Sequence, residues 1–381
     1  MKDGLGKAGA SRNEGVEPEQ SMNETHSESA RTFRAGPLLS RRWETVARKS
    51  GFACSTAGEA REWKAELVRK LRELIGYDRM APAELRPRIT EEVEFEDFLR
   101  ERVEIQTEPG LVMPVYVLRP KDGVSGPRPA VIAPHGHHGG GKLSIAGGCE
   151  IPEVVRAMEA YNYGYGLEFA RAGFVTFCPD ARGFGERREF PEAGGDPLNG
   201  SCEWLNHMAL PLGQTVTGMW VWDLHRLVDY IQARGDCSAD HIGCAGLSGG
   251  GLQTLWASAL DERIRCAVVS GYFYGFREAL LEQPENCSCN YVPHLFEHVD
   301  AGDLGALLAP RPFLVETGAE DSLNGRSGLA NVRSQTQIAR AAYRLFNAED
   351  LFAHDVCEGG HRWYGRSAIP WMRKHLAEPE R

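Results

Sequence analysis

Several features that define other classes of protein are missing from this chain of 381 residues. It has no apolar run of about 18 residues, which is the length that a membrane-spanning helix needs. It carries 43 basic against 53 acidic residues, a net charge of −10, and the basic residues form no cluster. This balance argues against a nucleic-acid-binding surface and against adhesion to anionic membranes. We therefore expect a small-molecule partner, with no nucleic acid and no membrane.

Neither the start of the chain nor the spacing of its cysteines indicates secretion. Residues 1–37 are rich in Gly, Ser, Glu, Asn and Arg, a composition typical of a disordered N-terminal tail and unlike that of a secretory signal. The ten cysteines include no Cys-x-x-Cys spacing, so we expect free thiols and a cytoplasmic protein. Cys287 and Cys289 form one close pair. Because the sequence near them offers no partner ligands, they are expected to be unlinked loop thiols rather than a redox or metal site.

The sequence does contain enough apolar material for a core, since 42% of its residues are hydrophobic and 25% are charged. Residues 38–88 are interpreted as an accessory helical segment. Trp63, Leu67 and Leu71 recur there at helical spacing, and Gly76 ends the pattern. One face of this helix is expected to pack on the main body.

Residues 89–381 are expected to form the main domain. Two extended runs, 100–107 and 111–118, flank a Pro-Gly turn and predict a hairpin. Short apolar runs then alternate with helical or loop stretches. These runs lie at residues 130–133, 174–178, 242–246, 266–270, 313–317 and 351–356. The pattern predicts an α/β fold with a mostly parallel, eight-stranded sheet and helices on both faces.

Two long stretches, 187–216 and 271–308, interrupt this alternation. Connections of such length are usually lids or binding walls, so we interpret them as lid-like insertions. The second is rich in aromatic residues, which serve either as the roof of a pocket or as core. Two charged pairs nearby are expected to be structural: Arg182 with Glu186, and Asp223 with Arg226.

The sequence 246–250, Gly-Leu-Ser-Gly-Gly, joins an apolar run to a helical pattern. This context is typical of a nucleophile elbow, in which a serine occupies a strained turn and its hydroxyl is exposed at a helix N-terminus. Gly246 and Gly250 provide the space that such a turn needs. Ser248 is therefore the candidate nucleophile, and the N–H of Gly249 is a candidate oxyanion donor.

A serine hydroxyl needs a base, and the base needs a carboxylate that orients it. Asp321 follows the apolar run 313–317, and His361 follows the run 351–356 in a glycine-rich loop. The order Ser248, Asp321, His361 is the one expected for a hydrolase with a nucleophile elbow. Three nearby residues compete less well: Glu320 as a neighbouring acid, and Glu316 and His354 as residues inside the expected strands.

The loop 134–142 after the first parallel strand contains three histidines and three consecutive glycines. A His-Gly element at this place commonly supplies the second oxyanion donor, here the N–H of His137. A metal site formed by His135, His137 and His138 is the alternative, but the loop has no carboxylate after the histidines. We expect no metal and no other cofactor, and His138 is best explained as a polar loop residue.

These residues together resemble the α/β-hydrolase superfamily, and within it the branch of dienelactone-hydrolase-like proteins and acetyl xylan esterase-like carboxylesterases. The resemblance runs from about Arg86 to Leu376. It rests on His135-Gly136, Asp180-x-Arg182-Gly183, Gly246-x-Ser248-x-Gly250, Ala309-Pro310-Arg311-Pro312, Gly318-x-x-Asp321 and Gly359-Gly360-His361. The sequence 287–293 also resembles that branch, without a function that we can assign.

The resemblance implies a carboxylic ester hydrolase, acting on a small-molecule ester through an acyl-enzyme. Gly249 stands where acetyl xylan esterases often carry Gln, so the chain departs from their pattern directly after the nucleophile. Hydrolysis of a lactone, thioester or peptide on the same triad is an alternative that the elbow does not separate. A noncatalytic binding protein on a hydrolase scaffold is the third hypothesis, although such proteins typically lack a triad member, and here all three are present.

Overall fold

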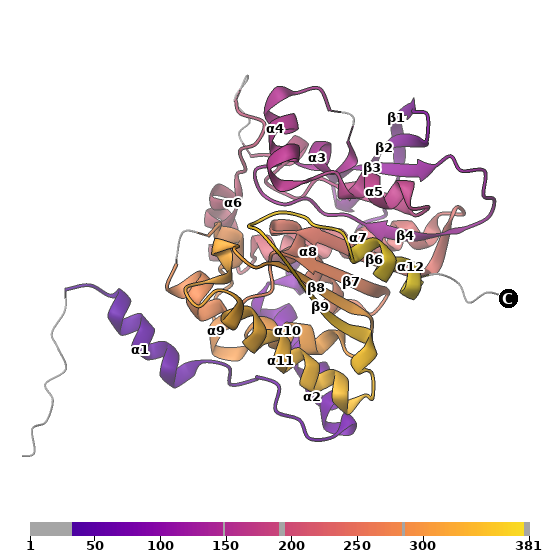
Figure 1. Ribbon diagram of the computed structural model, residues 1–381. Coiled ribbons are helices and arrows are strands. Elements are labelled where there is room, and N and C mark those ends of the chain that lie inside the picture. Colours follow the sequence, from indigo (N-terminus) through magenta and orange to yellow (C-terminus); the bar gives the residue numbers. More distant parts are fainter. Residues whose placement is uncertain (1–32, 148, 190–194, 284–285, 377–381) are drawn as a thin grey trace, which may run out of the picture.

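A computed structural model describes residues 33–376, except 148, 190–194 and 284–285. Its centre is a nine-stranded sheet in the order β1-β2-β3-β5-β4-β6-β7-β8-β9 (Figure 1). The strands are β1 (Arg88–Glu94), β2 (Phe98–Glu108), β3 (Leu111–Pro120), β4 (Arg128–Ile132), β5 (Val175–Pro179), β6 (Cys237–Leu247), β7 (Ile264–Ser270), β8 (Phe313–Gly318) and β9 (Phe352–Cys357). The six strands from β4 to β9 are parallel, whereas β1, β2 and β3 pair antiparallel and add to the edge next to β5.

The α/β fold with a mostly parallel sheet is confirmed, but the expected number of eight strands is wrong. The additional strand is β1, whose residues Arg-Ile-Thr-Glu-Glu-Val-Glu contain no apolar run. It lies at the edge, where most of its side chains are exposed, and it pairs through its backbone with β2. Backbone pairing needs no hydrophobic pattern, so sequence periodicity could not identify this strand.

Helices cover both faces of the sheet (Figure 1). One face packs against α7 (Val216–Ala233), α8 (Gly249–Leu260), α10 (Ala301–Leu308) and α11 (Leu329–Leu345). The other packs against α3 (Lys142–Ala146), α5 (Tyr165–Arg171) and α12 (Ala368–Leu376), with α4 (Pro152–Tyr161) beside α3. Side chains of β7 alternate between the two: Val268 lies in one core, and Ala267 and Val269 lie in the other. This alternation is the two-residue period of a strand that is buried on both faces.

Between residue 33 and the sheet, two α-helices form instead of the single expected helix: α1 (Gly36–Val46) and α2 (Ala57–Leu74). Leu67 and Leu71 of α2 are buried in the same core as α8, while α1 has no buried residue. Arg48 joins the segment to the main body through a two-pronged ion pair with Asp303, at 2.8 and 2.9 Å. Residues 1–32, most of the expected tail, lie outside the described residues, and within those described no helix is long and apolar enough to cross a membrane.

The two insertions contact each other beyond the carboxyl ends of the parallel strands. The first contains α6 (Cys202–Ala209), and the second contains a π-helical turn (Arg277–Leu281), a short 3₁₀ turn (Ser288–Asn290) and α9 (Leu295–His298). Asn206 of α6 donates a hydrogen bond to the carbonyl of Ser288 at 2.6 Å. Both insertions therefore contribute to one structure over the edge of the sheet where ligands of α/β proteins bind.

Candidate active site

Ser248 lies at the sharp turn between β6 and α8, with φ 60° and ψ −120°. A positive φ is strained for a residue with a side chain, and it is the geometry that the sequence pattern predicts. A Cβ at Gly246 would lie 2.5 Å from the carbonyl carbon of Gly250, and a Cβ at Gly250 would lie 2.2 Å from the carbonyl oxygen of Pro134. The glycines on both sides of Ser248 therefore allow the strand, the helix and the loop after β4 to meet.

His361 and Asp321 form a short contact of 2.6 Å between Nδ1 and Oδ2. The carboxylate only accepts hydrogen bonds, so the Nδ1 atom of His361 carries the proton, and Nε2 of the neutral ring is left as an acceptor. Asp321 is 4% exposed, and its second oxygen accepts a hydrogen bond from the N–H of Leu323 at 2.9 Å. Glu320, the neighbouring acid, is exposed. The contact thus favours Asp321 as the partner of the histidine.

Glu316 does not contact His361, but it holds the loop that carries this histidine. It is fully buried in β8 and accepts hydrogen bonds from Ser270 Oγ at 2.7 Å and from the N–H groups of Tyr364 and Gly365 at 3.0 and 2.8 Å. Burial raises the pKa of this carboxyl group above its ordinary value. The third competing residue, His354, lies in β9, and its Nε2 atom contacts the hydroxyl of Thr317 at 3.1 Å.

Ser248 and His361 line the same cavity, whose volume is about 340 Å³. The wall includes residues of the second insertion and of the loops that follow β4, β6, β8 and β9. These are His137, His138, Tyr161, Tyr163, Gly249, Leu252, Tyr272, Tyr274, Asn286, Cys287, Asn290, Ser322 and Leu323. Of the aromatic residues in the second insertion, Tyr272 and Tyr274 line the cavity, whereas Phe273 and Phe276 are part of the core.

The three histidines of the loop after β4 have different surroundings. His135 is 1% exposed, its Nε2 accepts a hydrogen bond from the N–H of Ala181 at 3.1 Å, and burial lowers the pKa of its ring. His138 is exposed at the cavity, as a polar loop residue would be. The ring of His137 packs on the elbow: a Cβ at Gly249 would lie 2.5 Å from its Nδ1 atom. This contact gives a structural reason for glycine directly after Ser248.

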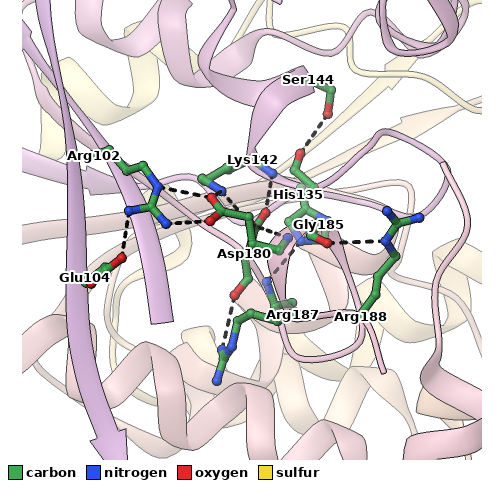
Figure 2. A network of polar contacts seen from close by, with 12 residues as sticks. Arg102, Glu104, His135, Lys142, Ser144, Asp180, Gly185, Arg187 and Arg188 are labelled. Carbon is green, nitrogen blue, oxygen red and sulfur yellow. Dashed lines mark hydrogen bonds and ion pairs between the residues drawn. The ribbon is translucent and has the colours of Figure 1, made fainter. Parts of the chain in front are cut away.

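A buried ionic network anchors the far end of the same loop (Figure 2). The ammonium group of Lys142 donates to Asp180 at 2.6 Å and also contacts Glu186, and the backbone N–H of Lys142 donates to Asp180 at 2.8 Å. Arg102 of β2 continues the network through Glu186. Burial disfavours the charged form of Lys142, but the carboxylates of Asp180 and Glu186 together outweigh this effect and raise the pKa of the ammonium group. The network fixes the loop between β4 and α3 next to the elbow.

Both expected charged pairs are wrong. Glu186 pairs with Lys142 and Arg102, while Arg182 forms two hydrogen bonds to Asp223 at 2.8 and 2.9 Å. Burial favours the neutral form of Asp223, but the guanidinium groups around it lower its pKa to about 2. Arg226 instead pairs with Asp229. Glu186 and Asp223 thus pair with residues of other elements, whereas Arg226 pairs with a residue of its own helix.

In the part of the chain that the structure describes, two groups of side chains have donor atoms close enough together to hold a metal ion. Glu316, Asp355 and Cys357 form one, in which both carboxylates already accept hydrogen bonds from protein groups. His137, Cys202, Cys287 and Cys289 form the other. The expectation that Cys287 and Cys289 lack partner ligands is therefore wrong. The residues beside these two cysteines, His137 and Cys202, are remote in the sequence, so no local spacing could have revealed them.

Comparisons with known proteins agree with this fold. The solved structure of a "putative acetyl xylan esterase" from Bacteroides fragilis NCTC 9343 is similar, with a TM-score of 0.77 and 18% identity over 92% of this chain and 97% of that one. A glucuronoyl esterase from Solibacter usitatus is similar with a TM-score of 0.63 and 18% identity, over 87% of this chain and 97% of that one.

The sequence comparisons identify the family. "Putative hydrolase YtaP" of Bacillus subtilis (strain 168) is 31% identical over 257 residues, which are 65% of this chain and 77% of that protein. The sequence model of the Abhydrolase family matches residues 45–352. The chain therefore belongs to the Abhydrolase family and has the α/β-hydrolase fold, as its motifs predict.

Proposed function

We propose that the protein hydrolyses carboxylic esters by a Ser248–His361–Asp321 triad. The observation that carries the proposal is the 2.6 Å contact between His361 and Asp321, on a histidine that shares its cavity with Ser248 at a strained elbow. A buried carboxylate that holds an imidazole in this tautomer prepares Nε2 to accept a proton. All three side chains follow strands whose carboxyl ends meet at one edge of the sheet.

In this mechanism the Oγ atom of Ser248 attacks the ester carbonyl while Nε2 of His361 takes its proton. The N–H groups of Gly249 and His137 donate to the oxyanion that forms. The first turn of α8 has no carbonyl of its own helix for the N–H of Gly249, which supports this role. His361 then protonates the departing alcohol, and a water molecule repeats the cycle on the acyl-serine. No step needs a cofactor.

The cavity wall supports a small ester with a polar alcohol part. Tyrosine rings and amide side chains surround Ser248, and several are already held by the protein: Tyr163 donates to the carbonyl of His137 at 2.8 Å, and Tyr272 donates to Asn290 at 2.9 Å. A volume of about 340 Å³ admits an acetyl-sized acyl group more readily than a long chain. The names of the similar structures, an acetyl xylan esterase and a glucuronoyl esterase, favour a carbohydrate ester among such substrates.

The test is a series of p-nitrophenyl esters of increasing acyl length, together with acetylated xylo-oligosaccharides, lactones and thioesters. We expect the highest kcat/KM on acetate and a loss of turnover in Ser248→Ala. A fluorophosphonate probe should label the wild type and not this variant. Absence of labelling in the wild type would refute the assignment as a serine hydrolase. A preference for lactones or thioesters would show that they, rather than simple esters, are the substrate class.

A further inference from the structure

Three cysteines and one histidine, whose side chains the proposed hydrolysis does not use, meet beside the cavity. Two of them, His137 and Cys287, line it. One donor atom from each of His137, Cys202, Cys287 and Cys289 lies within 4.8 Å of all the others. They come from three separate segments: the loop after β4, the first residue of α6, and the short 3₁₀ turn of the second insertion with the residue before it. Among the described residues all ten cysteines are free thiols.

The spacing of the group agrees with one tetrahedral ion. Zinc binds thiolate sulfur at about 2.3 Å and imidazole nitrogen at about 2.0 Å, so two ligands of one tetrahedral zinc ion lie roughly 3.5 to 3.8 Å apart. The Sγ atom of Cys289 lies 3.4 Å from Nε2 of His137. A disulfide needs sulfur atoms about 2.05 Å apart, and no two of these cysteines are bonded.

The surrounding structure holds the donor atoms together by contacts of the backbone. The hydroxyl of Thr217 donates to the carbonyl of Cys289 at 2.5 Å, and Asn206 donates to the carbonyl of Ser288 at 2.6 Å. Cys202 and Cys289 are 3% and 1% exposed. The cluster is thus built from anchored segments rather than from mobile surface residues.

We propose that His137, Cys202, Cys287 and Cys289 bind one zinc ion. Thiolate and imidazole ligands suit zinc and disfavour magnesium and calcium, which prefer oxygen. Four protein ligands complete a tetrahedron and leave no position for water or substrate, so the ion has a structural role. Binding converts the thiols to thiolates and releases their protons to solvent, and the imidazole binds in its neutral form.

The ion would connect the two insertions and the loop that carries a candidate oxyanion donor. Cys202 belongs to the first insertion, Cys287 and Cys289 belong to the second, and His137 belongs to the loop after β4. With Nε2 on the metal, the ring of His137 would be held against Gly249, where its Nδ1 atom already packs. His137 would therefore be a positioning residue through its side chain, besides the proposed role of its backbone N–H.

Metal analysis of the purified full-length protein tests the zinc site without any substrate. The result therefore does not depend on whether the proposed hydrolysis is correct. We expect one zinc ion per chain after gel filtration, and less than about a tenth of that in Cys287→Ser. Cys54→Ser, which changes a cysteine outside the cluster, is the matched control and should retain its zinc. Cobalt in place of zinc should give the intense visible bands of a tetrahedral thiolate complex.

A second measurement on the wild type does not depend on the folding of a variant. Alkylation of the native protein, followed by mass spectrometry, should spare Cys202, Cys287 and Cys289 until a chelator is added. Three outcomes would overturn the proposal: no zinc in protein that was folded with zinc present, equal zinc in Cys287→Ser and the wild type, or iron with acid-labile sulfide instead of zinc. A disulfide between any two of the four-residue cluster's cysteines in freshly purified protein would overturn it as well.

Discussion

Replacement of Asp321 by Asn tests the acid of the proposed triad with little change in shape. In the wild type, Oδ2 of Asp321 lies 2.6 Å from Nδ1 of His361, and the other oxygen accepts from the N–H of Leu323 at 2.9 Å. The oxygen of an asparagine would stay on the Leu323 N–H, which leaves its NH₂ group facing the histidine. Because this NH₂ group is a donor, the ring must present Nδ1 without a proton and hold the proton on Nε2.

A histidine in that tautomer cannot take the proton of Ser248. We therefore expect kcat on p-nitrophenyl acetate to fall by about 10⁴, equivalent to roughly 5 kcal/mol in the barrier, with KM changed much less. Steady-state kinetics with active-site titration gives both constants. The melting temperature should change little, because the hydrogen bond to Leu323 remains.

Glu320→Gln is the matched control for Asp321→Asn. Glu320 is the adjacent acid but is exposed, so removal of its charge should leave kcat within about twofold of the wild type. The reasoning would be refuted if Asp321→Asn kept more than about a tenth of the wild-type kcat, or if Glu320→Gln lost as much activity as Asp321→Asn.

Three further variants test the surroundings of the triad. Gly249→Ala should lower kcat by about a hundredfold or more, because its Cβ would lie 2.5 Å from His137 and displace the oxyanion loop, whereas Gly235→Ala, with open space around it, should be neutral in the same assay. Glu316→Gln should lower the free energy of unfolding by about 1–3 kcal/mol in urea titrations and should also lower kcat, because one amide oxygen cannot satisfy three donors. If both quantities were unchanged, the positioning role of Glu316 would be contradicted. The third variant is His354→Gln. Burial, together with nearby arginines, lowers the pKa of His354 to about 4, so the stability that its neutral ring contributes is present above about pH 6.5 and is lost as the pH falls through 4. The wild type should therefore lose stability relative to His354→Gln between about pH 6.5 and 4, and parallel curves of stability against pH would contradict this.

The core of the fold was accessible from the sequence because its signals are local. Most of the parallel strands are apolar runs, and the elbow around Ser248 is specified by glycines whose neighbours leave no room for a side chain. Strand β1 was missed because an edge strand held by its backbone has no such run. The expected disordered tail at residues 1–37, the boundary at 88 and the cytoplasmic location stay predictions.

The sequence by itself determined the order of the elements and the candidates for nucleophile, acid and base, because each candidate follows the end of a predicted strand. Only the tertiary structure decided which polar side chains meet. In the folded chain, Asp321 rather than Glu320 contacts His361, and Arg182 pairs with Asp223. His137 lies beside cysteines from the two insertions. The distances between these side chains depend on how whole helices and strands pack, and the pattern of residues along the sequence does not specify that packing.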